Sequence, residues 1–223
     1  MSEPLPFRRA RRPEQVELRR AAIFTAAREA LAGRSVREIT LRELAEGAGV
    51  AKSHVLRYFD SREAVFLELL AEDWAAWLDD LADRIGTAAV PAGDPAQRLG
   101  SLLAETLRAR PVLCDLFAAM SGELEANVSL ASARAFKRRG YDYTTRLAEL
   151  AARAAPGLSE AAAIAFARAL IAGVAGLWPF TNPNEIVATA SLEFGQRLGP
   201  DRFERELRDT ATALIIGFRA RGG

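Results

Sequence analysis

The chain has 223 residues and a formal net charge of +1 at pH 7, and half of its residues are hydrophobic, which is ample for a packed core. Its single cysteine, Cys114, excludes an intramolecular disulfide and therefore a secreted disulfide scaffold. The one histidine lies sixty positions from that cysteine, so we expect no metal site, no cofactor and no histidine-dependent catalysis.

Basic residues are concentrated near the N-terminus. Residues 1–60 contain twelve Lys and Arg against eight Asp and Glu, whereas residues 61–223 contain eighteen against twenty-one. This asymmetry is consistent with a polyanionic partner for the N-terminal part. Residues 1–13 are expected to form a flexible basic arm. They lack the apolar stretch of a signal peptide, so we expect a cytoplasmic protein.

The first two predicted helices follow this arm. Apolar residues at helical spacing predict a helix over 14–32. Thr40 and Glu43 then form a T-x-x-E capping box, in which each residue bonds to the backbone amide of the other. This box predicts that a second helix begins at about residue 41 and runs to 48.

A short helix and a long helix come next. The turn at Gly49 leads to a third helix predicted over 51–59. Asp60 and Ser61 are both suitable caps for a fourth helix, and Asp60 with Glu63 predicts a second capping box.

The remaining chain also has helical patterns, and alternating β-branched runs are absent, which predicts an all-α fold. Further helices are predicted over 96–109, 111–125, 130–155, 160–177 and 201–219, with a short extra helix within 184–198. The stretch "AAAIAFARALIAGVAGLWPF" over 161–180 is apolar enough to imitate a membrane span. Because Arg168 lies near its middle and Pro179 near its end, we interpret it as a helix buried in protein, with no membrane partner.

Two short helices joined by a glycine turn, with a longer helix behind them, have the plan of a helix-turn-helix. Subtracting the core positions of the third helix leaves an outward set of donors suited to base edges and phosphates. This set is Lys52, Ser53, His54, Arg57 and Tyr58. Thr40 and Arg62 flank it at helix starts, where phosphates are favoured. The alternative is an ordinary solvated helix surface.

Residues 39–70, "ITLRELAEGAGVAKSHVLRYFDSREAVFLELL", closely resemble the DNA-binding domain of TetR-family transcriptional regulators. The resemblance implies phosphate contacts for Thr40, Tyr58 and Arg62, and groove contacts for the set Lys52, Ser53, His54 and Arg57. Two departures stand out. Ala51 replaces the serine that usually caps the third helix, and Leu56 replaces a tyrosine that usually touches a phosphate.

The resemblance also implies three parts: an arm over 1–13, a helix-turn-helix domain over 14–60, and an effector-binding and dimerisation domain over 61–223. The effector cavity would lie among the fourth to seventh helices and accept a small apolar or amphipathic molecule. Its expected lining is Trp77, Phe117, Met120, Tyr143 and Leu147. The helix over 160–177 is apolar nearly all round and must be covered on every side, so with 201–219 it is expected to form the dimer interface.

The sequence thus predicts a homodimeric, ligand-responsive regulator, most often a repressor in this family, that binds a palindromic operator in double-stranded DNA and is not an enzyme. The alternative is a dimeric helix-turn-helix protein that senses no small ligand and acts architecturally or through a protein partner. It would have a filled core where the first has a cavity.

Overall fold

The computed structural model describes residues 13–87 and 93–221, and these contain helices but no strand, as the sequence predicted. The N-terminal part, here called the head, consists of α1, a short 3₁₀ turn η1, α2 and α3. Their bounds are α1 Pro13–Leu31, η1 Val36–Glu38, α2 Leu41–Gly47 and α3 Lys52–Val55. The predicted arm lies outside the described residues, except that Pro13 begins α1.

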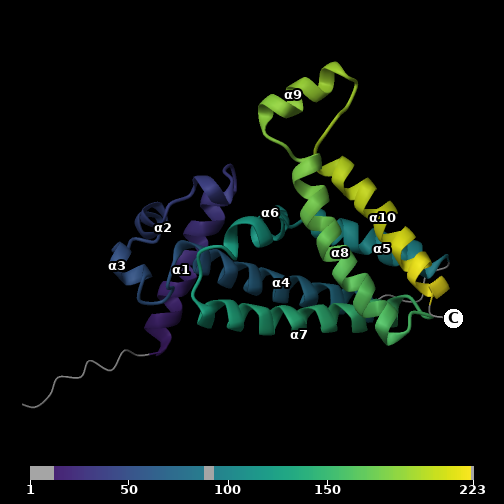
Figure 1. Cartoon of the computed structure of the whole chain (residues 1–223), viewed down its shortest axis with the longest axis horizontal. Coiled ribbons are helices and arrows are strands. Elements are labelled where there is room, and N and C mark those ends of the chain that lie inside the picture. The colour runs from purple at the N-terminus through teal and green to yellow at the C-terminus, as the bar shows by residue number, and fades with distance from the viewer. Residues whose placement is uncertain (1–12, 88–92, 222–223) are drawn as a thin grey trace, which may run out of the picture.

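The remaining helices form the body of the molecule. They are α4 Arg62–Thr87, α5 Pro95–Arg108, α6 Pro111–Ala119, the π-helical turn η2 Met120–Leu124, α7 Leu130–Ala154, α8 Glu160–Thr181, α9 Glu185–Glu193 and α10 Pro200–Arg221. The head lies at one end, α4 and α7 run side by side away from it, and α8 and α10 pack together at the other end (Figure 1). Because α4 starts in the head and continues into the body, it joins the two parts.

Aromatic side chains mark the core of each part. In the head, the rings of Phe24 and Phe59 lie 5.7 Å apart, and the Arg20 guanidinium lies 4.9 Å from the Phe59 ring centroid. In the body, the Trp74 ring meets Phe117 edge-on at 5.0 Å. Edge-to-face pairs add to the burial of apolar area, so these contacts help to fix how α1, α4 and α6 pack.

The third helix is shorter than predicted, because α3 ends at Val55 and residues 56–58 form a turn. Its N-cap residue, Ala51, makes no side-chain capping bond. The amide of Tyr58 donates to Val55 O at 2.9 Å, a bond three residues back that tightens the chain into a turn. Turn and helix together still span the predicted stretch.

The predicted Asp60–Glu63 box is wrong. Ser61 caps α4 instead, because its hydroxyl oxygen accepts a bond from the Ala64 amide at 3.1 Å. The Asp60 carboxylate accepts a bond from the Ser132 hydroxyl at 2.9 Å, on the first turn of α7. A long-range partner has therefore replaced the local one.

Two later helices end elsewhere than predicted. The helix expected over 111–125 changes at Met120 into the wider turn of η2. The helix expected to stop at 177 continues through Pro179 to Thr181. Proline is tolerated in this last turn, which is held by bonds from the Asn182 amide to Trp178 O at 2.8 Å and from the Trp178 indole to Asp115 at 2.6 Å.

Helix α8 is long and apolar enough to cross a membrane by length and composition, yet 44% of its most apolar window is buried in the protein. It packs against α6, α7 and α10. This packing accounts for much of its apolar character.

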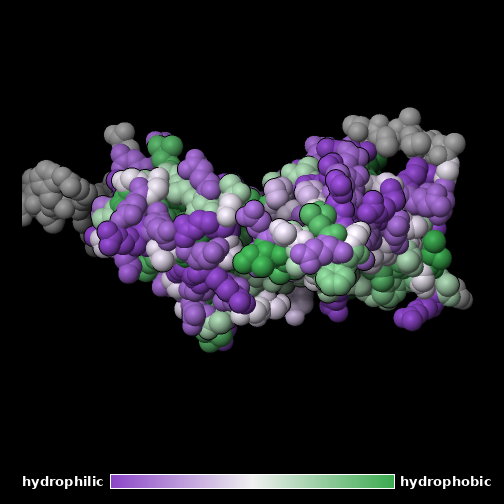
Figure 2. All heavy atoms as spheres, turned by 90° about the horizontal axis from the view of Figure 1, so that it is seen from above, coloured by the Kyte–Doolittle hydropathy of each residue, from purple (hydrophilic) through white to green (hydrophobic). Residues whose placement is uncertain are grey.

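The short extra helix exists as α9, and none of its residues is buried. It projects from the junction of α8 and α10 in Figure 1. Figure 2 looks onto this projection, where hydrophobic side chains lie among hydrophilic ones. Ile186 is 82% exposed and Phe194 is 81% exposed.

Candidate nucleic-acid interface and effector pocket

The start of α2 is held by the predicted capping box. The Thr40 hydroxyl accepts from the Glu43 amide at 3.2 Å, and the Glu43 carboxylate accepts from the Thr40 amide at 2.7 Å. The Arg34 guanidinium donates to the same carboxylate at 2.7 Å. Arg34 and Thr40 together lower the pKa of Glu43 to about 2. Thr40 is exposed, and its hydroxyl donates to the Glu43 carboxylate at 2.7 Å, so a phosphate would compete with Glu43 for this donor.

The segment over 52–58 is anchored from beneath and polar outside. Val55 and Phe59 are buried, at 0% and 3% exposure, and hold α3 against α1 and α2. Four side chains of the predicted set lie on the outer side, of which His54 is half-buried and three are exposed: Lys52, Ser53 and Arg57. Neither Lys52 nor Arg57 makes an ion pair within the described residues. Both cations therefore remain available to a partner.

Tyr58 is half-buried, and its hydroxyl accepts a bond from the Arg19 guanidinium at 3.3 Å. This bond ties the turn after α3 to the start of α1. The hydroxyl keeps its own proton to donate.

Arg62 does not have the free guanidinium that a phosphate contact needs. One terminal nitrogen donates to Ile39 O at 3.1 Å and to two further carbonyls at 3.4 Å, those of Val36 and Arg37. The other terminal nitrogen pairs with Glu63 at 2.8 Å. In the free chain Arg62 holds the turn before α2 against the start of α4, and its phosphate contact stays a prediction.

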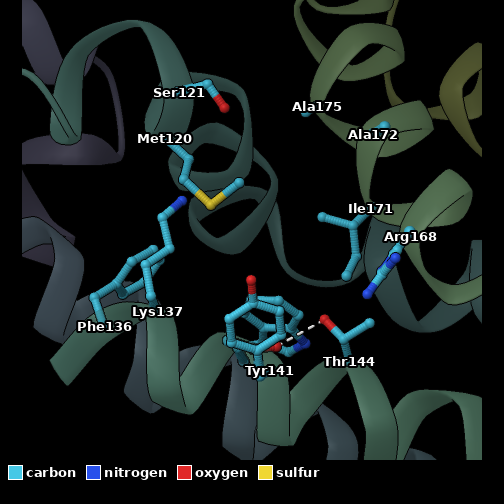
Figure 3. A pocket seen from close by; sticks show the side chains of 12 residues that line it. Met120, Ser121, Phe136, Lys137, Tyr141, Thr144, Arg168, Ile171, Ala172 and Ala175 are labelled. Atoms are coloured by element: carbon cyan, nitrogen blue, oxygen red, sulfur yellow. Dashed lines mark hydrogen bonds between the residues drawn. The ribbon is translucent and has the colours of Figure 1, made fainter. Parts of the chain in front are cut away.

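A pocket of about 330 Å³ opens between α4, η2, α7 and α8. Trp74, Phe136 and Ile171 supply large apolar side chains to its wall. Its remaining lining is Met120, Ser121, Lys137, Gly140, Tyr141, Thr144, Arg168, Ala172 and Ala175. In Figure 3 these side chains converge from α7 below, η2 above and α8 opposite. A larger groove of about 550 Å³ between α5 and α10 is walled mainly by polar side chains.

Of the five predicted lining residues, only Met120 lines this pocket. Trp77 is 1% exposed and donates its indole N–H to the Thr106 hydroxyl at 3.0 Å, so it faces α5 instead. Phe117 and Leu147 are buried in the core, and the Tyr143 ring packs 5.4 Å from the Trp74 ring. These four residues do not line this pocket, and their contact with an effector stays a prediction. The missed residue on α4, Trp74, lies three positions before Trp77 on the same helix.

Two family models match the chain. Residues 23–69 match "Bacterial regulatory proteins, tetR family", and residues 71–222 match "Tetracyclin repressor-like, C-terminal domain". The chain belongs to the TetR family. No curated protein sequence matches it.

Several solved structures of transcriptional regulators share the fold at low sequence identity. A TetR transcriptional regulator from Rhodococcus sp. RHA1 is 19% identical, with a TM-score of 0.55 over 91% of this chain and 97% of that one. The fatty acid degradation regulator FadR from Bacillus halodurans is 14% identical, with a TM-score of 0.55 over 92% and 97%. FadR from Bacillus subtilis in complex with stearoyl-CoA is 16% identical, with a TM-score of 0.51 over 86% and 97%.

In this TetR-family chain, three elements that line the pocket, α4, η2 and α7, are also connected to the head. Helix α4 contributes Trp74 and is continuous with Arg62. The turn η2 contributes Met120, and its Glu123 pairs with Arg37 of η1. The third such element is α7.

Helix α7 bonds to the segment between the head and α4 at one place, and at a second place it reaches the head through Glu68 of α4. Ser132 donates to Asp60, as described above, and Arg139 pairs with Glu68 at 2.5 Å. Glu68 also pairs with Arg20 of α1 at 3.2 Å. Although burial opposes ionisation, the two arginines keep the pKa of Glu68 below its usual range. A change in the pocket can therefore reach the head by three separate contacts.

Proposed function

We propose that this protein is a cytoplasmic, homodimeric transcriptional repressor that binds a palindromic operator and is released from it by a small amphipathic effector. The observation that carries the proposal is the direct bonding of three pocket-wall elements to the DNA-binding head, through Glu123–Arg37, Asp60–Ser132 and the continuous helix α4. The pocket itself favours a ligand-sensing protein over one that senses no ligand. Gene regulation, and not catalysis, is the proposed activity.

The proposed DNA contacts divide into two groups. Lys52, Ser53, His54 and Arg57 would reach base edges, because they lie outward around a helix anchored by buried Val55. Tyr58 would hold a phosphate through its hydroxyl proton, and Thr40 would do so in exchange for its bond to the Glu43 carboxylate.

The proposed dimer uses α8 and α10. The open side of α8 carries Gly173 and exposed Gly176, and α10 carries Ile216, which is 51% exposed. Small and apolar side chains on neighbouring helices allow close approach of a second pair, which would give a four-helix interface. A twofold axis through it would present two α3 helices to two half-sites about 34–36 Å apart, or at a multiple of that spacing.

The proposed effector is amphipathic because the pocket combines a large apolar wall with polar groups at its rim. The relative from Bacillus subtilis binds stearoyl-CoA, which is an amphipathic molecule. By analogy with that relative, the pocket of this chain would accept a molecule with an apolar chain lying against Trp74 and Phe136.

The proposed coupling is antagonistic. An effector between α7, η2 and α8 would displace η2 and the ends of α4 and α7, and so change the separation of the two α3 helices. Trp74 lies twelve residues from Arg62, about 18 Å along α4, so the distance from the pocket to the head along this helix is short. Ligand and operator would then weaken each other by the same coupling free energy, typically about 1–3 kcal/mol.

The test has two steps. Selection of bound sequences from a random duplex pool should return a palindrome. A ligand found by thermal shift should then bind more weakly to the operator complex than to the free protein. A non-palindromic product would overturn the dimeric reading, and equal ligand affinities with and without operator would overturn the release mechanism.

A further inference from the structure

The charges around the pocket are all of one sign. Its twelve lining residues include two cations, Lys137 and Arg168, and no carboxylate. Lys137 pairs with Glu125 at 2.6 Å, so its charge is compensated within the protein. Arg168 forms no ion pair and donates no hydrogen bond to a described residue. One uncompensated positive charge therefore lies on the pocket wall.

Arg168 is also the only charged residue of α8 after Glu160 at its first position. The rest of this helix is apolar or small, and Ile171 and Ala172 lie beside Arg168 on the pocket wall. In Figure 3 the Arg168 guanidinium extends from α8 into the space facing Thr144 of α7. Arg168 is exposed, so water solvates its guanidinium in the free protein, and no acceptor among the described residues makes it a bridge within the fold.

A second donor of the wall also lacks an acceptor. Trp74 is 3% exposed, and its buried indole nitrogen has no hydrogen-bond partner in the protein. A buried N–H without an acceptor costs about 1–3 kcal/mol. Trp74 and Arg168 can only donate, so a ligand that satisfies them must supply acceptors.

The apolar part of the wall extends from α8 onto the elements opposite it. Phe136 of α7 and Met120 of η2 face the same space as Arg168 in Figure 3. The pocket therefore has an arginine on one side and aromatic and thioether groups on the other. This arrangement fits a molecule with a charged group at one end and an apolar chain. Charge-assisted bonds to a carboxylate or phosphate suit the planar guanidinium in particular.

We propose that the pocket is selective for anionic amphiphiles, whose acidic group pairs with Arg168 and whose apolar chain lies against Trp74, Phe136 and Met120. This rests on the proposed function in one respect, namely that the pocket is the effector site. It adds the chemical class of the effector and the residue that distinguishes it from neutral or cationic molecules of the same shape.

The experiment measures binding of three probes to the full chain near neutral pH, by calorimetry and without DNA. The probes are decanoate, decyl phosphate and the uncharged decanol, which share one chain length. We expect both anions to bind about tenfold or more tightly than decanol, the ratio that a charge-assisted hydrogen bond contributes. Decanoate and decyl phosphate differ only in their acidic group. The tighter binder of the two shows whether the pocket prefers a carboxylate or a phosphate.

Three variants locate the effect. Arg168→Gln should lower the affinity for the anions about tenfold and leave that for decanol unchanged. Arg138→Gln, an exposed α7 arginine outside the pocket lining, is the matched control and should change neither. Gly140→Leu should block all three probes, because a Cβ at this wall position meets no atom within 4 Å and the added side chain can occupy the pocket.

Each other outcome has a definite meaning. Equal binding of decanol and the anions, unchanged anion binding by Arg168→Gln, no binding of any probe, or anion binding that survives Gly140→Leu would overturn the inference. A change in oligomeric state of Arg168→Gln, seen by sedimentation, would assign the arginine to the subunit interface and would also overturn it. Charge-dependent binding that leaves operator affinity unaltered would instead support the inference and overturn the release mechanism.

Discussion

At the scale of single residues, two arginines of the head have opposite surroundings. Arg57 is exposed and forms no ion pair among the described residues, whereas the guanidinium of Arg62 bonds to three carbonyls and to Glu63. A free cation can contribute to DNA binding, and a satisfied one contributes to the geometry of the head. The two residues should therefore respond differently to substitution.

We expect Arg57→Ala to lower specific operator affinity by about 1–3 kcal/mol and to relax preference at one position of each half-site. Its free energy of unfolding should stay near that of the wild type. We expect Arg62→Gln to lower the free energy of unfolding by about 1–3 kcal/mol, because it removes the side-chain donor from the partly buried carbonyl of Ile39 and the ion pair with Glu63. Urea unfolding and a panel of operator variants measure the two effects. Equal unfolding free energies for the two variants would contradict the role given to Arg62.

The ionisation of Glu43 offers a second test at this scale. Its pKa falls from 4.5 to about 2 in the folded chain, first because of the Arg34 guanidinium and then because of Thr40. A carboxyl group with a lowered pKa contributes stability that is complete above its unfolded pKa and is lost as the pH falls toward the folded one. The contribution of Glu43 should therefore disappear between about pH 4.5 and about pH 2.

Carboxyl titration by NMR should give the low midpoint for Glu43 directly. Arg34→Gln should raise this midpoint, because it removes the largest cause. Arg42→Gln is the control, since Arg42 pairs with Glu46 and not with Glu43. A midpoint that did not move in Arg34→Gln would show that the capping box alone lowers the pKa.

At the scale of elements, α8 serves two surfaces of the body. One side, with Ile171 and Arg168, lines the pocket, and an adjacent side with Gly173 and Gly176 is open. A Cβ at either glycine meets no atom within 4 Å. The fold of one chain does not require these glycines, so their lack of a side chain suits the proposed contact with a second chain.

We expect Gly176→Glu to convert the dimer to monomers at micromolar concentration and to abolish specific operator binding. The substitution improves intrinsic helix propensity, so helicity and thermal stability of the monomer should be retained. Gly86→Glu is the matched control, because a Cβ at Gly86 on α4 also meets no atom within 4 Å. Sedimentation velocity distinguishes the two variants, and a dimeric Gly176→Glu protein would contradict the proposed interface.

At the scale of the whole molecule, the head and body are joined by polar contacts as well as by α4. The pair Arg37–Glu123 is the contact that links the pocket wall at Met120 and Ser121 to the turn before α2. Breaking it should separate ligand binding from DNA binding without removing either.

We expect Glu123→Gln to keep ligand affinity and operator affinity near their wild-type values when each is measured alone. The coupling free energy between them, typically about 1–3 kcal/mol, should fall. Asp79→Asn is the control, because it breaks the 2.7 Å pair with Arg146 between α4 and α7, away from the head. Coupling that fell equally in both variants would assign the effect to general loosening of the body.

Local features of the fold were predictable because their partners are close in sequence. The Thr40–Glu43 box, the turn at Gly49 with its φ of 64°, and the succession of helices all depend on neighbours within about one helical turn. The outward set on α3 was predictable for the same reason, since the buried residues Val55 and Phe59 determine the remaining faces.

Tertiary packing decided what the sequence could not. Arg62 and Asp60 took long-range partners, at Ile39 and Ser132, that no local pattern reveals. Along α4, Trp74 and Trp77 are equally apolar, and only the positions of α5 and α7 determine which of them faces the pocket. A buried helix presents apolar side chains in every direction, so its sequence shows that it is covered and does not show by what.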